Sequence, residues 1–159
     1  MELREETGLK AEEFIFTNLI NDFAIYQGHP VFFYKRAQLL ISDIHRRFKD
    51  KKVGELKNID KLTGLADYKI PQALRKIGIL EYSPELSEKI DNRILISAGS
   101  EGEIEIRANM VWAIELMREE IEKKIPDIKA VGVDSYLWLL AQTKSPNGKP
   151  YHLTRTIFY

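Results

Sequence analysis

The segment from 101 to 125 constrains the fold of this chain more than any other. Its sequence, EGEIEIRANMVWAIELMREEIEKKI, has an acidic first turn, a basic last turn and an apolar stripe at helical spacing. A stripe of this kind is more often part of a core than a cofactor site. The sequence therefore predicts that the longest helix lies here. The stripe consists of Met110, Trp112, Ala113, Leu116, Met117 and Ile121.

Periodicity and capping signals predict helices over most of the remaining chain. Pro71 disfavours the α region for Ile70, so a new helix begins near it, and Gly78 is placed to end that helix. Ser83 and Pro84 suit the N-cap and the first helical position of the next helix. The predicted helices cover residues 11–27, 32–48, 59–67 (capped by Asp60), 68–78, 83–90 and 134–143.

The remaining segments give little support for a sheet. Residues 49–58 are charged and predict a solvated loop, and residues 94–100 are short enough to be extended without a partner. With 159 residues, the chain can bury a core as one unit. We therefore predict a single, compact and mainly α-helical domain over residues 1–159.

Composition excludes several classes of protein. Lys plus Arg and Asp plus Glu each number 24, so the basic excess typical of proteins that bind phosphate backbones is missing. There is no cysteine, and the three histidines lack metal-ligand spacing, so we expect neither a metal site nor a cofactor. No apolar run approaches the length of a membrane span, and the polar N-terminus is not signal-like. A cytoplasmic protein is expected.

Three aspartates are candidates for chemistry. Asp67 stands between two predicted helices, where backbone N–H groups would keep it ionised, although spacing alone favours a plain N-cap. Asp60 lies seven residues earlier, so on a continuous helix both acids would face one side. Two acids in one cleft are typical of glycosidic-bond cleavage, but such pairs also occur by accident. Asp134 is likewise an ordinary N-cap candidate for the helix over 134–143.

Cationic residues and the C-terminal tail are weaker candidates. Lys35 and Arg36 follow three aromatic residues and could hold a phosphate. Adjacent helix positions diverge by about 100°, however, so a separate salt bridge for each is the preferred interpretation. The tail with His152, Arg155 and Tyr159 is expected to dock over a groove, because its TIFY end is too apolar to remain free in water.

Several strings, in order, resemble one known family. They are DFAIYQGHPVFFYKRAQLLISDI, NIDKLTGLADYKIPQALRKIGILEYS, GEIEIRANMVWAIELM, DSYLW and HLTRTIFY. The matching motifs within these strings are each short, but their joint occurrence in this order is specific to the family. On this basis the chain resembles the queuosine salvage proteins over about residues 14–159. Members of this family look like queuosine 5′-monophosphate N-glycosidases. The resemblance implies an α-helical fold similar to that of helix-hairpin-helix DNA glycosylases.

The resemblance implies hydrolysis of the bond between a 7-deazaguanine base and ribose 5-phosphate, which supplies queuine for tRNA modification. It implies that Asp67, in the motif that continues with Tyr68, contacts the base, and that Asp134 contacts it too. Carboxylates accept hydrogen bonds from ring and exocyclic N–H groups. The resemblance also implies an upstream acid as nucleophile or oxocarbenium stabiliser. Asp60 is the nearest carboxylate, although Lys61 is an alternative for that aligned position.

The chain departs from the family pattern in the expected pocket. The changes replace a stacking aromatic by Leu65, a tyrosine by Ser135, an aspartate by Leu139 and an arginine by Lys69. These changes favour a smaller or less polar 7-deazaguanine ligand. The candidate catalytic residues are Asp60 and Asp67. The candidate substrate-binding residues are Lys35, Arg36, Leu65, Asp67, Tyr68, Asp134, Ser135, His152 and Arg155.

Three functional hypotheses follow from the resemblance and from the length of the chain. Family members are about twice as long, and their N-terminal half contributes a histidine that neither His29 nor His45 matches. The first hypothesis is an N-glycosidase, because Asp67 and Asp134 are retained. The second is a binding or accessory protein that needs a partner chain or a second copy to complete the site. The third is a DNA glycosylase, which the zero net charge and the lack of a glycine-rich hairpin disfavour.

Overall fold

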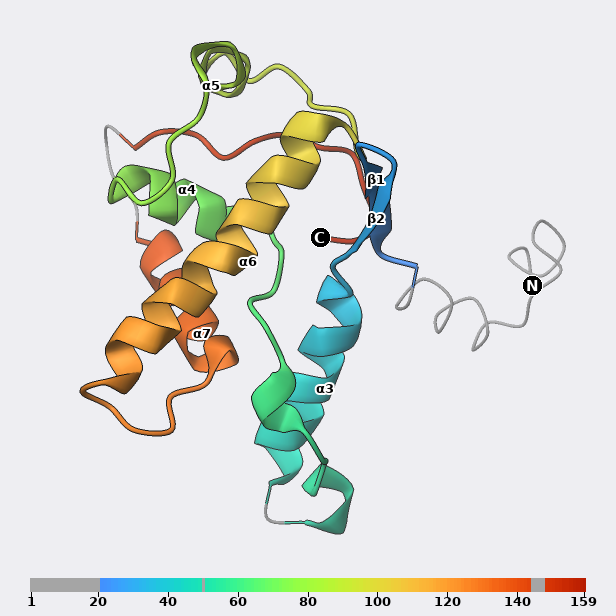
Figure 1. Cartoon of the computed structure of the whole chain (residues 1–159), viewed down its shortest axis with the longest axis vertical. Coiled ribbons are helices and arrows are strands. Elements are labelled where there is room, and N and C mark those ends of the chain that lie inside the picture. Colours follow the sequence, from blue (N-terminus) through green and yellow to red (C-terminus); the bar gives the residue numbers. More distant parts are fainter. Residues whose placement is uncertain (1–20, 50, 144–147) are drawn as a thin grey trace, which may run out of the picture.

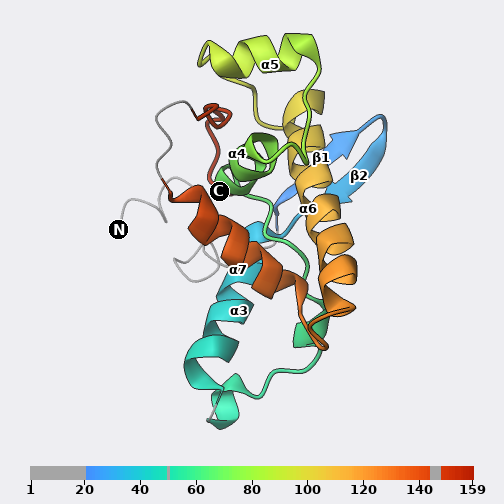
Figure 2. The ribbon, with the colours of Figure 1, turned by 90° about the vertical axis from the view of Figure 1, so that its left-hand side faces the viewer.

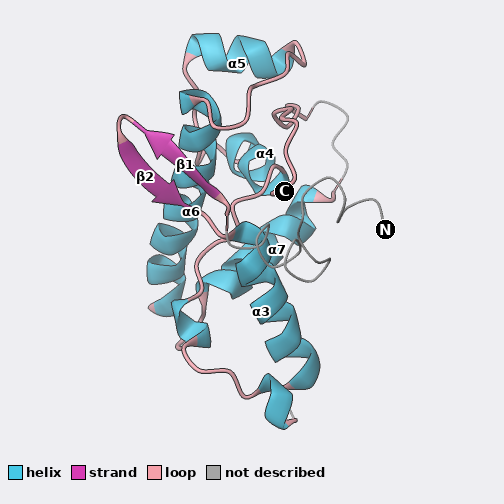
Figure 3. Cartoon of the chain, turned by 90° about the vertical axis from the view of Figure 1, so that its right-hand side faces the viewer, coloured by secondary structure: helices cyan, strands magenta, loops and turns pink. Residues whose placement is uncertain are grey.

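A computed structural model describes residues 21–49, 51–143 and 148–159. These residues are mainly helical and include a small antiparallel sheet of two strands (Figures 1 and 3). The strands are β1 (Phe23–Tyr26) and β2 (His29–Phe32). The helices are α3 (Lys35–Phe48), α4 (Lys69–Lys76), α5 (Pro84–Asp91), α6 (Glu101–Glu122) and α7 (Ala130–Ala141), with short 3₁₀ turns at η1 (Lys52–Gly54) and η2 (Ile59–Lys61).

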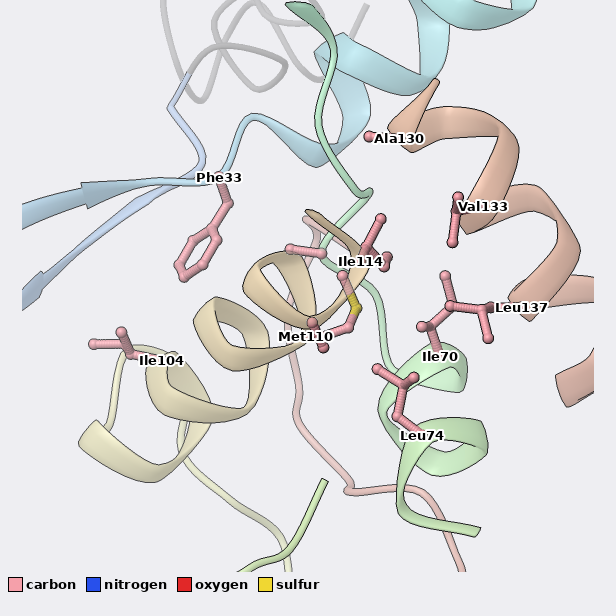
Figure 4. Close-up of a cluster of buried hydrophobic side chains, with 11 residues drawn as sticks. Phe33, Ile70, Leu74, Ile104, Met110, Ile114, Ala130, Val133 and Leu137 are labelled. Atoms are coloured by element: carbon pink, nitrogen blue, oxygen red, sulfur yellow. The ribbon is translucent and has the colours of Figure 1, made fainter. Parts of the chain in front are cut away.

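The main core lies where α4, α6 and α7 meet. Figure 4 shows side chains of these three helices pointing into a common space, with Phe33 entering from the segment between β2 and α3. Burying one valine, leucine, isoleucine or methionine side chain stabilises a fold by roughly 1.5–3 kcal/mol. The buried side chains at this junction therefore hold the three helices together. The buried cluster comprises Phe33, Ala66, Ile70, Leu74, Ile104, Met110, Ala113, Ile114, Ala130, Val133 and Leu137.

The helix signals around proline and glycine are confirmed. α4 begins at Lys69, just before Pro71, and the chain leaves it through Gly78, whose φ is +76°. The helix α5 has Pro84 at its first position, and the Ser83 hydroxyl accepts a hydrogen bond from the Leu86 N–H at 3.3 Å. Both signals act through the local backbone, so no tertiary contact is needed to predict them.

The predicted helix over 11–27 is wrong where the structure describes it. Residues 23–26 form β1, which turns through Gln27 and Gly28 into β2. Both turn residues have positive φ, +48° and +83°, as a tight two-residue hairpin requires. Alternate residues of β1 are exposed and half-buried, which is strand periodicity. The part of the predicted helix before residue 21 lies outside the described residues.

Two further helix predictions need correction. The segment 59–67 is helical only in η2, and residues 62–67 are non-helical, so Asp60 caps no α-helix. The helix α7 begins at Ala130, four residues before Asp134. Asp134 therefore lies inside the helix and is not its N-cap. Residues 94–100 form no regular strand, and Leu95 makes only an isolated parallel bridge to Leu153.

The boundaries of the outer helices and the stripe of α6 also differ from expectation. α3 starts at Lys35 rather than at residue 32, and α6 ends at Glu122. Within the predicted stripe of α6, Met110 and Ala113 are buried, whereas Trp112 is 63% exposed. Among the described helices, none combines the length and apolarity that crossing a membrane requires.

Candidate active site

Asp67 lies at the corner where the extended segment 62–67 enters α4. Its Oδ1 accepts hydrogen bonds from the N–H groups of Lys69 and Ile70, both at 2.9 Å. The side chain therefore caps the first turn of α4, as the plainer interpretation of the sequence predicted. The residue is only 5% exposed, so the carboxylate is held rigidly within the protein.

Asp134 approaches the same corner from α7. It is 4% exposed, and its Oδ2 accepts a hydrogen bond from the Leu65 N–H at 2.7 Å. The bond ties α7 to the extended segment two residues before Asp67. Tertiary packing thus brings together two carboxylates that are far apart in the sequence. We call Asp67 and Asp134 the acid pair.

Burial sets the electrostatics of the acid pair. It raises the pKa of Asp134 to about 7, and the charge of Asp67 acts in the same direction. Burial also raises the pKa of Asp67, although the Ile70 N–H and the charge of Lys35 oppose the change. Near neutral pH, Asp134 therefore exists in both its protonated and its charged form. The pair can offer a proton donor and an acceptor at one place, an arrangement typical of acid–base sites.

Each member of the acid pair has one oxygen that accepts no hydrogen bond from another described residue. Within the described ranges, no residue donates a hydrogen bond to Oδ2 of Asp67 or to Oδ1 of Asp134. These oxygens are the atoms that could accept N–H groups of a heterocyclic base.

The three candidate wall residues beside the acid pair in the sequence differ in exposure and in contacts. Leu65 is 8% exposed. Ser135 is exposed, and its hydroxyl donates to the Val131 carbonyl of its own helix at 2.8 Å, which occupies its proton. Tyr68 is half-buried, and its ring centroid lies 4.9 Å from that of Tyr151 in the C-terminal tail.

Asp60 does not join the acid pair. It is exposed in η2 and lines a depression of about 330 Å³ together with Lys61, Arg118 and Lys129. Neither Asp67 nor Asp134 lines that depression. The predicted shared face requires a continuous helix from Asp60 to Asp67, and the extended segment between them removes it.

The two cations at the start of α3 diverge. Lys35 is near enough to influence both members of the acid pair electrostatically. Arg36 donates from Nη1 to the Ile157 carbonyl of the tail at 3.1 Å. Among the described residues, neither forms the salt bridge that the sequence favoured.

The C-terminal tail contacts α6 through Tyr159, whereas Ile157 in its apolar TIFY end is 58% exposed. His152 is 2% exposed, and burial lowers its pKa to about 4. Its Nε2 lies 3.2 Å from the Tyr159 hydroxyl, which donates in turn to Glu103 Oε1 at 2.9 Å. Because the hydroxyl proton is used on Glu103, His152 must donate from Nε2. Arg155 is exposed.

Sequence reasoning missed three buried charged residues, Asp22, Glu103 and Arg107. Asp22 and Arg107 form an ion pair in which Nη2 lies 2.8 Å from each carboxylate oxygen, and they are 1% and 3% exposed. The spacing of Glu103 and Arg107 between apolar residues of GEIEIRA was the available signal. Groups of three or more His, Asp or Glu side chains that could hold a metal ion are absent from the described residues.

Comparison with known proteins adds the family. The model of the family described as "Queuosine salvage protein" matches residues 13–159, nearly the whole chain. The chain belongs to the queuosine salvage protein family. The match includes both members of the acid pair, the start of α3 and the tail.

Three relatives in this family carry the name queuosine 5′-phosphate N-glycosylase/hydrolase. Those of Sphaerobacter thermophilus and Dictyostelium discoideum are 43% and 42% identical over 138 residues. That of Bos taurus is 38% identical over 148 residues. Each alignment covers 87% of this chain but 43% of the relative. The chain thus spans less than half the length of these relatives.

Proposed function

We propose that this chain is an N-glycosidase that hydrolyses queuosine 5′-phosphate, or a closely related 7-deazaguanine nucleotide, to the free base and ribose 5-phosphate. The reaction would supply queuine for tRNA modification. The observation that carries the proposal is the buried acid pair, in a chain whose named relatives are queuosine 5′-phosphate N-glycosylase/hydrolases. Acid–base catalysis works best with groups whose pKa lies near the working pH, and burial raises the pKa of both acids here, that of Asp134 to about 7.

The two acids would have separate roles. Hydrolysis breaks the bond between the base nitrogen and C1′ of the ribose, adds a water hydroxyl to C1′ and delivers a proton to the base. Protonated Asp134 would donate to the departing base, because its pKa of about 7 makes it a proton donor near neutral pH. Asp67 is fixed by two N–H groups and would hold the base through its second oxygen.

The remaining candidate residues complete the proposal around the acid pair. Lys35 acts electrostatically on both acids and is therefore the first candidate cation for the 5′-phosphate, with Arg36 and the exposed Arg155 as further candidates. His152 is buried and neutral near pH 7, so its role in the proposal is to hold the tail through Tyr159. Leu65, Tyr68 and Ser135 would form the wall beside the base. Asp60 remains the second candidate for the catalytic carboxylate, to be tested directly.

A second function is favoured by length. The chain covers 43% of the length of two of its named relatives. A binding or accessory protein, completed by a partner chain or by a second copy, would retain the acid pair without turnover. We also propose the helix-hairpin-helix glycosylase likeness and a cytoplasmic location.

The deciding experiment incubates the purified protein with queuosine 5′-phosphate and follows free queuine by chromatography. Asp67→Asn and Asp134→Asn would run beside Asp60→Asn, with Asp43→Asn as a control at an exposed acid of α3. Loss of queuine release in Asp67→Asn and Asp134→Asn would support a catalytic role for the acid pair, provided that Asp60→Asn and Asp43→Asn still release queuine. Loss at position 60 as well would assign a catalytic role to Asp60.

The same experiment separates the two functions. Absence of release, with a thermal shift on adding queuine, would support the binding or accessory protein. Absence of both release and shift would contradict the proposed substrate class. A thermal shift by queuine that Asp67→Asn abolishes would locate binding at the acid pair even without turnover.

A further inference from the structure

The guanidinium of Arg107 contacts two segments that border the acid pair. Arg107 lies in the second turn of α6 and is 3% exposed. Its Nε donates to the carbonyl of Ala66 at 3.3 Å, and its Nη2 donates to both oxygens of Asp22 at 2.8 Å. Ala66 is bonded directly to Asp67. The same planar group therefore fixes the backbone beside one acid and also holds Asp22.

Asp22 extends this connection to the cation of the site. Its Oδ2 accepts a hydrogen bond from the Lys35 N–H at 2.9 Å, and its carbonyl accepts one from the Phe33 N–H at 2.9 Å. The carboxylate thus fixes the first residue of α3, where Lys35 stands. Through Asp22 on one side and Ala66 on the other, Arg107 sets the spacing between Lys35 and Asp67.

The orientation of Arg107 is itself determined by its surroundings. Its guanidinium carbon lies 3.9 Å from the ring centroid of Phe33 and 4.8 Å from that of Tyr159. Glu103 Oε1 lies 3.6 Å from Nη1, and that carboxylate also accepts the Tyr159 hydroxyl. A planar fork between two rings can bind two acceptors at fixed angles, and a lysine ammonium cannot reproduce this geometry.

We propose that Arg107 is a positioning residue of the acid pair, which holds Asp67 and Lys35 in register without touching the substrate. The inference rests on the proposed function only for its catalytic consequence; the geometric claim stands without it. A buried ion pair is weak evidence for stability alone, because apolar replacements are often as stable. The hydrogen bond from Arg107 Nε to the Ala66 carbonyl is the contact that connects the Arg107–Asp22 ion pair to the acid pair.

The test compares Arg107→Lys with Arg75→Lys. Arg75 is a matched control because it is also largely buried and makes a bidentate pair, with Asp91 at 2.7 and 3.1 Å, but it joins α4 to α5 away from the acid pair. Carbon-13 NMR of labelled aspartate would follow the titration of Asp134, and thermal unfolding would report stability.

Both variants are expected to unfold at lower temperature, but only Arg107→Lys should change the titration. Loosening the Ala66 segment admits water, and because burial is the main cause of the raised pKa, the Asp134 midpoint should fall by about one pH unit. With substrate, the pH dependence of kcat/KM should move in the same direction. Equal titration shifts in both variants, or none in Arg107→Lys, would overturn the proposal.

A milder variant covers the case in which Arg107→Lys does not fold. Tyr159→Phe removes the hydroxyl that donates to Glu103 and contacts His152 Nε2, and it should shift the Asp134 midpoint in the same direction by a smaller amount. An unchanged midpoint in folded Tyr159→Phe would then count against the proposal. If wild-type protein releases no base while the Arg107→Lys titration moves, the proposed function fails and the positioning role stands.

Discussion

Asp60 and Asp67 are seven residues apart, yet they occupy opposite kinds of environment. Asp60 is exposed in a 3₁₀ turn beside Arg118 and Lys129. Asp67 is 5% exposed, caps α4 and faces Asp134 across the corner. Figure 2 shows α4 and α7 side by side, and the two helices contact each other.

The difference teaches that a carboxylate acquires unusual chemistry from burial and from fixed backbone donors, not from its place in a sequence motif. Burial raises the pKa of both members of the acid pair. An exposed acid of the same type keeps its hydration and can exchange partners with solvent. Substitutions of Asp60 and of the acid pair should therefore differ in the size of their effect on the unfolding free energy and in how that effect depends on pH.

The largest effect is expected from Asp134→Asn. In the folded protein Asp134 keeps its proton up to about pH 7, whereas the unfolded chain releases it near pH 3.8. The unfolding free energy therefore falls as pH rises between these values, by on the order of 3–4 kcal/mol. The raised pKa of Asp67 acts with the same sign. Asn removes the contribution of Asp134, and urea unfolding from pH 4 to 8 would measure the change in slope.

His152→Gln should change the slope in the opposite direction. The pKa of His152 is lowered from 6.5 to about 4, so its contribution to the unfolding free energy rises with pH in that window. The expected rise is about 3 kcal/mol. In the wild type it largely cancels the fall due to Asp134. If the two single variants show the same slope, the assignment of opposite signs is wrong.

A smaller effect is expected from Gly64→Ala, just before the corner. A Cβ there would lie 2.6 Å from Ile114 Cδ1, which belongs to the core between α4, α6 and α7. Overpacking of this kind costs about 1–3 kcal/mol. The Ile114→Val background removes the Cδ1 methyl, so Gly64→Ala should cost less there. Additive losses in a double-mutant cycle would show that the clash is not the cause.

Asp60→Asn should have the smallest effect on stability. The side chain is exposed and makes no hydrogen bond to any described residue, so the unfolding free energy should change by less than about 0.5 kcal/mol. A loss as large as that of Asp134→Asn would place Asp60 in a buried interaction and remove the contrast between the two acids.

Local signals explain which elements could be predicted. Pro71, Gly78, Ser83 and Pro84 act on their own backbone, and they account for both ends of α4 and for the start of α5. The hairpin was missed because its apolar residues also fit helical spacing. Short apolar runs do not distinguish a strand from a helix by periodicity alone.

The candidate site was only partly predictable for a related reason. Asp67 was identified as a cap, and that role follows from the backbone break beside it. The partnership with Asp134 depends on how α7 packs against the extended segment, which no spacing in the sequence contains. Arg107 stood in a noted string, but its contact with Ala66 is equally a product of packing.

The sequence by itself determined the helical class, the limits of α4 and α5, the aspartate at the corner and the family resemblance that the comparison confirmed. Only the tertiary structure decided that Asp134 rather than Asp60 faces Asp67, and that Arg107 ties Asp67 to Lys35. Capping and turn formation are short-range backbone effects that a few residues encode. Burial and pairing arise only when distant segments share a core, and these are what set the charge of the acid pair.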